Sequence, residues 1–329
     1  PAQLVLHEDQ LVGLRIYLLD NSGSTNAHDG KVVRADHTGR VSTLSCTRWE
    51  EIKHMAMEQA EWNCRIGCPC EFLLLNPGPP PLREGVGYAR LDPLHGDVQR
   101  QLSVLGRMLE SNIPTGATPL SQRVEEIHAR VSTNHADLVA RGQRVMLTVA
   151  TDGLPTSASS NRSTPEDRSL FVETLRHLML TLPVSVVIRL CTDEDVAVQF
   201  YNEVEGELEL PLDVLDDLAG EAQEIKDHGN GWFAYSPALH RLREGGTFTK
   251  LLDLLDERPL TPVEAALLAQ LLLRGEHDPP FPHEPVAFCQ AAAKHLQDAE
   301  DVYDPLLRGM APPVDILGLR VALAGGPAS

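Results

Sequence analysis

The sequence predicts a doubly wound α/β domain built on a mostly parallel sheet. Short, continuous apolar runs such as LRIYLLD (14–20) and RVMLTVATD (144–152) are typical of strands covered on both faces. Segments with helical periodicity and recognisable capping residues lie between these runs. This alternation of buried strands and helices favours a parallel sheet enclosed by two helical layers.

The first elements follow this alternation. After the strand at 14–20, we expect a helix over 47–62, because Thr47 can cap it and Glu50 can complete a capping box. CEFLLLN (70–76) then predicts the second buried strand.

The proline-rich segment PGPPPLREG forces a turn after that strand. VGYARL (86–91) is therefore expected to pair antiparallel with 70–76, as an edge strand. Helical patterns follow over 96–110 and 119–140, and they lead to the central strand at 144–152.

The later part of the domain begins with a clear helix start, because Thr164 can act as the cap and Pro165 as the first helical residue. VSVVIRLC (184–191) predicts another buried strand. The remaining expected elements are a helix near 194–203, a last strand at ELEL (207–210) and a helix over 212–225.

Strand signals fade after about residue 230, so we divide the chain into an α/β domain (1–229) and a small helical extension (230–329). Thr261 and Glu264 form a second capping box ahead of an apolar helix, and the pattern of 285–309 is also helical. Because these segments are too apolar to stand alone in water, we expect the extension to dock on the α/β domain.

Charge and hydropathy exclude several classes of partner. The chain has 28 Lys and Arg against 47 Asp and Glu, a net charge of −19, so we expect it to repel nucleic acid. No apolar run is long enough to span a bilayer, and residues 1–12 lack the zones of a signal peptide. Because the chain begins at Pro1, we expect a trimmed or processed form. We expect the protein to be cytoplasmic, or organellar if a targeting segment was removed before Pro1.

Three of the six cysteines lie close together in CRIGCPC, at Cys64, Cys68 and Cys70. Zinc would need a fourth ligand, and the spacing differs from the usual C-x-x-C pair. The pattern therefore favours thiols at a helix–strand joint, in a reducing compartment, over a metal site or a disulfide scaffold.

Oxygen-bearing side chains follow the predicted strands at one edge of the sheet. Asp20, Ser22 and Ser24 come after the first strand, and Asp152 follows the central strand. Thr118, in IPTGATPL, lies where a loop enters a helix. Each motif alone is an ordinary turn or cap, but ligands of doubly wound sheets bind at the carboxyl ends of the strands. Together the five residues predict a site for a hard divalent cation.

These three motifs, D-x-S-x-S, G-x-T-P-L and T-D-G, resemble the metal-ion-dependent adhesion site of the von Willebrand factor A family. The resemblance covers about residues 11–228 and implies a Rossmann-like fold. It implies that Asp20, Ser22, Ser24, Thr118 and Asp152 hold the metal, most simply Mg²⁺, with Mn²⁺ or Ca²⁺ as alternatives.

Residues 25–46 depart from the family pattern, because they separate the first motif from the helix that usually follows it directly. GKVVRADHTGRVSTL has the alternation and turn residues of a hairpin. We leave open whether it covers the metal site and shapes the choice of partner, or is an inert surface loop.

No phosphate-binding loop, H-E-x-x-H or G-x-S-x-G motif is present, so we expect no catalytic activity. A hydrolytic role for Asp20 and Asp152 would need a neighbouring base that the sequence does not offer. The family resemblance implies a metal-dependent interaction module, whose partner protein supplies an Asp or Glu, with assembly into a larger complex possible. The alternative is a subunit that serves a separate ATPase in a chelatase-type complex.

Overall fold

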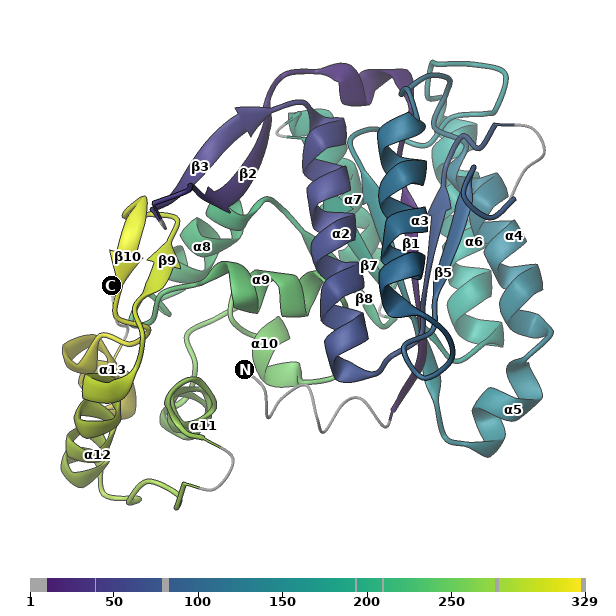
Figure 1. Ribbon diagram of the computed structural model, residues 1–329. Coiled ribbons are helices and arrows are strands. Elements are labelled where there is room, and N and C mark those ends of the chain that lie inside the picture. The colour runs from purple at the N-terminus through teal and green to yellow at the C-terminus, as the bar shows by residue number, and fades with distance from the viewer. Residues whose placement is uncertain are drawn as a thin grey trace.

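A six-stranded sheet forms the centre of the protein (Figure 1). The computed structural model describes residues 11–38, 40–78, 83–192, 194–208, 210–275 and 278–326. The strand order is β5-β4-β1-β6-β7-β8, and only β5 is antiparallel to its neighbour, so the predicted mostly parallel sheet with one antiparallel edge strand is confirmed. The strands are β1 (Val12–Leu19), β4 (Cys70–Leu74), β5 (Tyr88–Leu91), β6 (Arg144–Thr151), β7 (Val184–Leu190) and β8 (Leu212–Leu215).

Three helices cover one face of this sheet: α4 (Leu120–Ser132), α6 (Pro165–Thr181) and α7 (Asp195–Leu208). Their apolar residues share a core with strand residues such as Ile16 and Val149. Thr164 caps α6 in a capping box with Asp167, as the sequence indicates. The predicted single helix over 119–140 is two helices, because α4 ends at Ser132 and a separate α5 (His135–Ala140) follows.

The opposite face is covered by α2 (Arg48–Ile66) and α3 (Val98–Ser111). Tyr17 and Phe72 stack on this face with their ring centroids 4.8 Å apart. Thr47 caps α2 by accepting a 3.1 Å hydrogen bond from the Glu50 backbone N–H. The Glu50 carboxylate pairs with Lys53 at 2.7 Å.

The same face is completed by α9 (Pro237–Glu244). Thr148 Oγ1 donates to the backbone oxygen of Glu244 at 2.8 Å, and Arg15 Nε donates to that of Gly245 at 3.1 Å. The sheet residues under α9 are polar, so this helix is joined to the sheet by hydrogen bonds as well as by packing.

The end of the α/β arrangement differs from the prediction. The described residues of the expected strand 207–210 lie in or after α7, which continues to Leu208. The last strand is β8, and α8 (Leu218–Asp227) follows it, so the predicted helix over 212–225 is correct only in its second part. Asp213 in β8 lies 3.5 Å from Arg243 Nη2, a distant partner that local periodicity does not reveal.

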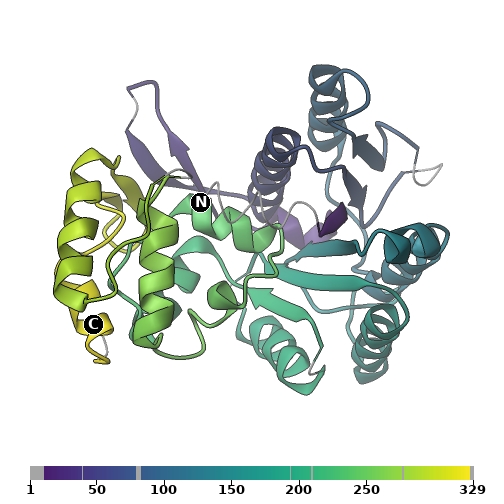
Figure 2. The same cartoon turned by 90° about the horizontal axis from the view of Figure 1, so that it is seen from below.

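The C-terminal residues gather on one side of the molecule (Figure 2, green to yellow). They form α10 (Lys250–Asp253), α11 (Pro262–Leu273), α12 (Pro285–Asp298), β9 (Val302–Asp304), β10 (Gly309–Ala311) and α13 (Ile316–Leu323). The Thr261–Glu264 capping box is confirmed. The helical prediction for 285–309 is wrong beyond Asp298, where β9 and β10 pair as a hairpin. The core of this region includes Ile225 of α8, so it packs against the α/β part.

Residues 25–46 do contain a hairpin, formed by β2 (Gly30–Ala35) and β3 (Val41–Cys46). Figure 1 shows it leaning toward β9 and β10. Thr43 Oγ1 and Tyr303 OH lie 2.8 Å apart, and Lys31 Nζ donates to Asp217 at 2.5 Å. The hairpin therefore connects the start of the chain to α8 and the C-terminal region.

Cys64 lies in α2, Cys68 in the connection that follows it and Cys70 at the start of β4, which is the predicted helix–strand joint. All six cysteines are free thiols. In the described part of the chain, no helix combines the length and the apolar character needed to cross a membrane.

Candidate metal centre

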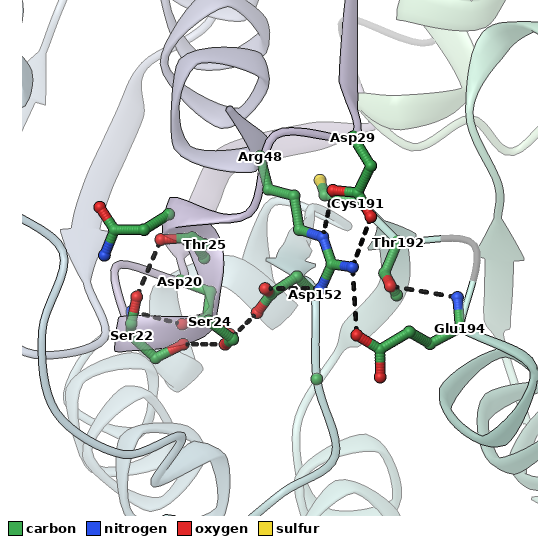
Figure 3. A network of polar contacts seen from close by, with 12 residues as sticks. Asp20, Ser22, Ser24, Thr25, Asp29, Arg48, Asp152, Cys191, Thr192 and Glu194 are labelled. Carbon is green, nitrogen blue, oxygen red and sulfur yellow. Dashed lines mark hydrogen bonds and ion pairs between the residues drawn. The ribbon is translucent and has the colours of Figure 1, made fainter. Parts of the chain in front are cut away.

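The predicted site residues lie at the carboxyl ends of β1 and β6, where the strand order of the sheet changes direction. At such a point the loops after the two neighbouring strands lead to opposite faces of the sheet. Ligands of doubly wound sheets bind between these loops. After β1, residues Gly23–Asn26 form the short 3-10 helix η1, which holds the serine-rich loop in a compact turn (Figure 3).

Asp20 is completely buried at the start of this loop. Its Oδ1 accepts a hydrogen bond from the Ser22 backbone N–H at 2.8 Å, and its Oδ2 accepts one from Thr151 Oγ1 at 2.7 Å. These bonds fix the carboxylate between the first loop and the end of β6.

A chain of hydroxyls joins the first loop to Asp152. The Oγ atoms of Ser22 and Ser24 are 2.9 Å apart, and Ser24 Oγ donates to Asp152 Oδ1 at 2.8 Å. Ser24 is exposed, whereas Ser22 and Asp152 are buried. Two of the three predicted motifs are thus in direct contact.

Thr118 brings in the third motif. A Cβ atom placed on Gly153 would be 3.9 Å from Thr118 Oγ1 and 4.0 Å from Ser24 Oγ, so both hydroxyls border this glycine. The loops are also tied together through their backbones, because Gly23 N–H donates to the oxygen of Gly116 at 3.1 Å. All five predicted residues therefore lie at one edge of the sheet.

Arg48, which the sequence analysis did not include, also reaches this site (Figure 3). Its Nη1 donates to Asp152 Oδ2 at 3.1 Å, and its Nε and Nη2 hold both oxygens of Asp29 at 2.7 and 2.6 Å. Nη2 also lies 3.1 Å from Glu194 Oε1. Arg48 is buried, while Asp29 and Glu194 are largely exposed, so one guanidinium links the inner site to two surface carboxylates.

The two aspartates differ in their compensation, because Arg48 pairs with Asp152 whereas Asp20 accepts hydrogen bonds from Ser22 and Thr151. Burial, followed by the negative charge of Asp152, raises the pKa of Asp20 to about 6. Burial also raises the pKa of Asp152, although Ser24 and Arg48 act in the opposite direction. A cation beside both carboxylates would remove this cost, since it favours their charged forms.

The donor set fits a hard divalent cation. Every side chain at the centre offers oxygen, and no sulfur or imidazole is present among the five residues. Asp152 Oδ1 faces Ser24 while its Oδ2 faces Arg48, so one of its oxygens stays on the side of the serine loop.

A separate acidic cluster exists at Glu221, Glu224 and Asp256, with ligand atoms within 4.8 Å of one another. Arg243 already lies 2.7 Å from Glu221 and 2.6 Å from Asp256. The guanidinium of Arg243 thus already neutralises part of the charge of Glu221 and Asp256, two of the three carboxylates in this cluster.

Arg48 was missed because it belongs to no motif, but one local signal marks it. It is the first residue of α2, where the helix dipole disfavours positive charge. An arginine at that position indicates a tertiary partner. Thr151, the other omitted residue, stands directly before Asp152 in the T-D-G motif.

Comparison with protein-family models and with curated proteins finds no match for this chain.

Proposed function

We propose that this protein is a metal-dependent interaction module of the von Willebrand factor A type. The observation that supports it best is the meeting of Asp20, Ser22, Ser24, Thr118 and Asp152, from three separate loops, at the switch point of a doubly wound sheet. The chain's own residues would hold Mg²⁺, or Mn²⁺, and a bound cation would supply an attachment point for a partner's carboxylate.

Each side chain has a distinct part in this proposal. Asp20 and Asp152 supply charge, and the hydroxyls of Ser22, Ser24 and Thr118 supply neutral oxygens. With two formal charges among five protein ligands, the intrinsic affinity should be modest and the shell should be incomplete. An Asp or Glu of a partner protein can complete it.

Arg48 is expected to position Asp152 rather than to bind the cation. It holds Oδ2 from the side opposite Ser24 and so orients Oδ1 toward the serine loop. It also lowers the local negative charge, which limits affinity for the metal and favours an added carboxylate.

Titration calorimetry with Mg²⁺ and Mn²⁺ tests the proposal on wild type, Asp152→Asn and Glu224→Gln. We expect one site in the wild type, a loss of affinity of about tenfold or more in Asp152→Asn, and no change in Glu224→Gln. Equal affinity in wild type and Asp152→Asn would show that these residues do not form the site. Loss in Glu224→Gln alone would move the metal to the Glu221, Glu224 and Asp256 cluster.

A further inference from the structure

A second candidate binding site is a cavity of about 800 Å³ at the other end of the sheet. It lies between the edge strand β5 on one side and α4 and α5 on the other, near the amino ends of β1 and β6. The cavity shares no residue with the candidate metal centre.

The cavity exists because β5 is covered by a helix on one face only. Ala89 and Leu91 pack into the core beneath α3. Tyr88 and Arg90 alternate with them and point to the other face, where they form a wall of the cavity. The helices of that face, α4 and α6, pack mainly over the central strands.

The charge of this cavity is opposite to that of the whole protein. Its lining contains three arginines and two acidic residues, which gives 3 − 2 = +1 within a chain of net charge −19. The charged lining residues are Arg90, Arg130, Arg141, Glu71 and Asp137.

Two of the arginines share a single buried carboxylate. Glu71 is 4% exposed, and it accepts from Arg90 Nη1 at 3.0 Å and from Arg130 Nη2 at 2.6 Å. Glu71 thus orients both guanidinium groups. Arg90 Nη2 also lies 3.4 Å from Asp92, so Arg90 has a second carboxylate partner, whereas Arg130 pairs with Glu71. Arg141 is exposed at the rim and makes no ion pair within the described part of the chain.

The rest of the lining combines apolar side chains with polar ones, among them Thr133, Asn134 and Gln143. Leu14, Ile16, Val131 and Leu138 line the cavity, and the Arg130 guanidinium lies 4.9 Å from the centre of the Tyr88 ring. Cavities of this size that combine an apolar surface with a few convergent polar groups are typical of small-molecule sites. Guanidinium groups in a fixed arrangement match the oxygens of carboxylates and phosphates.

We propose that this cavity binds a small organic anion, in which a carboxylate or phosphate is attached to an apolar or aromatic body. The anionic group lies between Arg130 and Arg141, and the body covers Leu138 and Tyr88. The net charge of the protein opposes such a ligand only at long range, because salt screens charges over about 8 Å at physiological ionic strength. Recognition therefore depends on the local arginines.

The test is calorimetric titration of the full chain with phenyl phosphate and with 4-phenylbutyrate, in chelator so that the metal centre cannot contribute. The uncharged 3-phenylpropanol and inorganic phosphate are tested as ligand controls. The protein variants are Arg141→Gln and Leu138→Asp at the cavity, and Arg65→Gln, on the exposed surface of α2, as the matched control.

We expect saturable binding of at least one aromatic anion with one site per chain, and markedly weaker binding of both ligand controls. Arg141→Gln and Leu138→Asp should each weaken it by about tenfold, and Arg65→Gln should leave it unchanged. Absence of saturable binding, or equal affinity in wild type and both cavity variants, would overturn the proposal. Binding of 3-phenylpropanol as tight as that of the anions would overturn the role of the arginines.

Discussion

Two buried carboxylates, Glu244 at the end of α9 and Asp20 after β1, have opposite electrostatic surroundings. Glu244 faces the polar side chains of the sheet, where Arg189 Nε of β7 donates to it at 2.9 Å, and His240 Nε2 is 3.2 Å away. Burial alone would raise its pKa, but His240 and Arg189 lower the pKa of Glu244 to about 2. Within the described residues, the donors to Asp20 are neutral groups, and its pKa is raised to about 6.

The different surroundings of Glu244 and Asp20 distinguish a carboxylate that stabilises the fold from one that is suited to binding a cation. A buried carboxylate that is already paired with a cation stabilises the fold. Removal of either partner destabilises the protein, because it leaves an unpaired buried charge. A buried carboxylate held only by neutral donors, beside a second carboxylate, keeps its capacity for an external cation. Under the proposed function, the loops after β1 and β6 would bind a cation, whereas the charges between the sheet and α9 stabilise the fold.

The largest loss of stability should come from removing the guanidinium of Arg189, which lies between the sheet and α9. Arg189 also lies 2.6 Å from Glu51, so Arg189→Met leaves two buried carboxylates without it. We expect a loss of about 3–5 kcal/mol in the free energy of unfolding, measured by urea denaturation in chelator. The exposed Arg65→Met is the control, with an expected change below about 0.5 kcal/mol. If Arg189→Met lowered the free energy of unfolding no more than Arg65→Met does, the ion pairs of Arg189 would not be the stabilising charges inferred here.

A smaller loss is expected when the carboxylate itself is neutralised. Glu244→Gln should cost about 2 kcal/mol near neutral pH, because Arg189 keeps Glu51 as a partner. The pKa of Glu244 is lowered to about 2, so its stabilising effect is present above its ordinary pKa of 4.5 and is lost as pH falls through about 2. The difference between variant and wild type, from denaturation at several pH values, should therefore shrink with acidification. A difference independent of pH would indicate packing instead of charge.

The smallest effect, and one of opposite sign, is expected at the candidate metal centre. In chelator, Asp20→Asn should leave stability unchanged or raise it by up to about 1 kcal/mol, since it removes one of two neighbouring buried charges. Thermal unfolding of both proteins in chelator measures this. A destabilisation above about 1 kcal/mol would mean that the Asp20 carboxylate stabilises the fold even without a metal ion.

The sequence predicts the sheet well because its strands carry their own local signal. β1, β4, β6 and β7 are continuous apolar runs, and the proline-rich turn identifies β5 as an antiparallel edge strand. β8 was missed because it has only four residues, one of them Asp213. Its partner Arg243 lies thirty positions later, so the placement of that aspartate in a strand depends on tertiary structure.

The candidate site is predictable only in part, for a similar reason. Asp20, Ser22 and Asp152 stand directly after strands, and Thr118 stands before a helix, so spacing alone places them at one edge. Which other side chains reach that edge depends on how α2 packs. Arg48 joins Asp152 across 104 positions of sequence, and only its unfavourable place at the start of a helix hints at this contact.

The attachment of α9 also has a consequence for how the chain is made. Arg15 in the first strand bonds to the backbone of Gly245, 230 positions later, and Thr148 bonds to Glu244. Synthesis on the ribosome proceeds from the N-terminus, so β1, β6 and β7 emerge well before the helix that completes their polar face. During that interval the contacts of Arg15 with Gly245, of Thr148 with Glu244 and of Arg189 with Glu244 cannot yet form. Such non-local contacts slow folding, and a half-finished sheet is the form of this protein most in need of a chaperone.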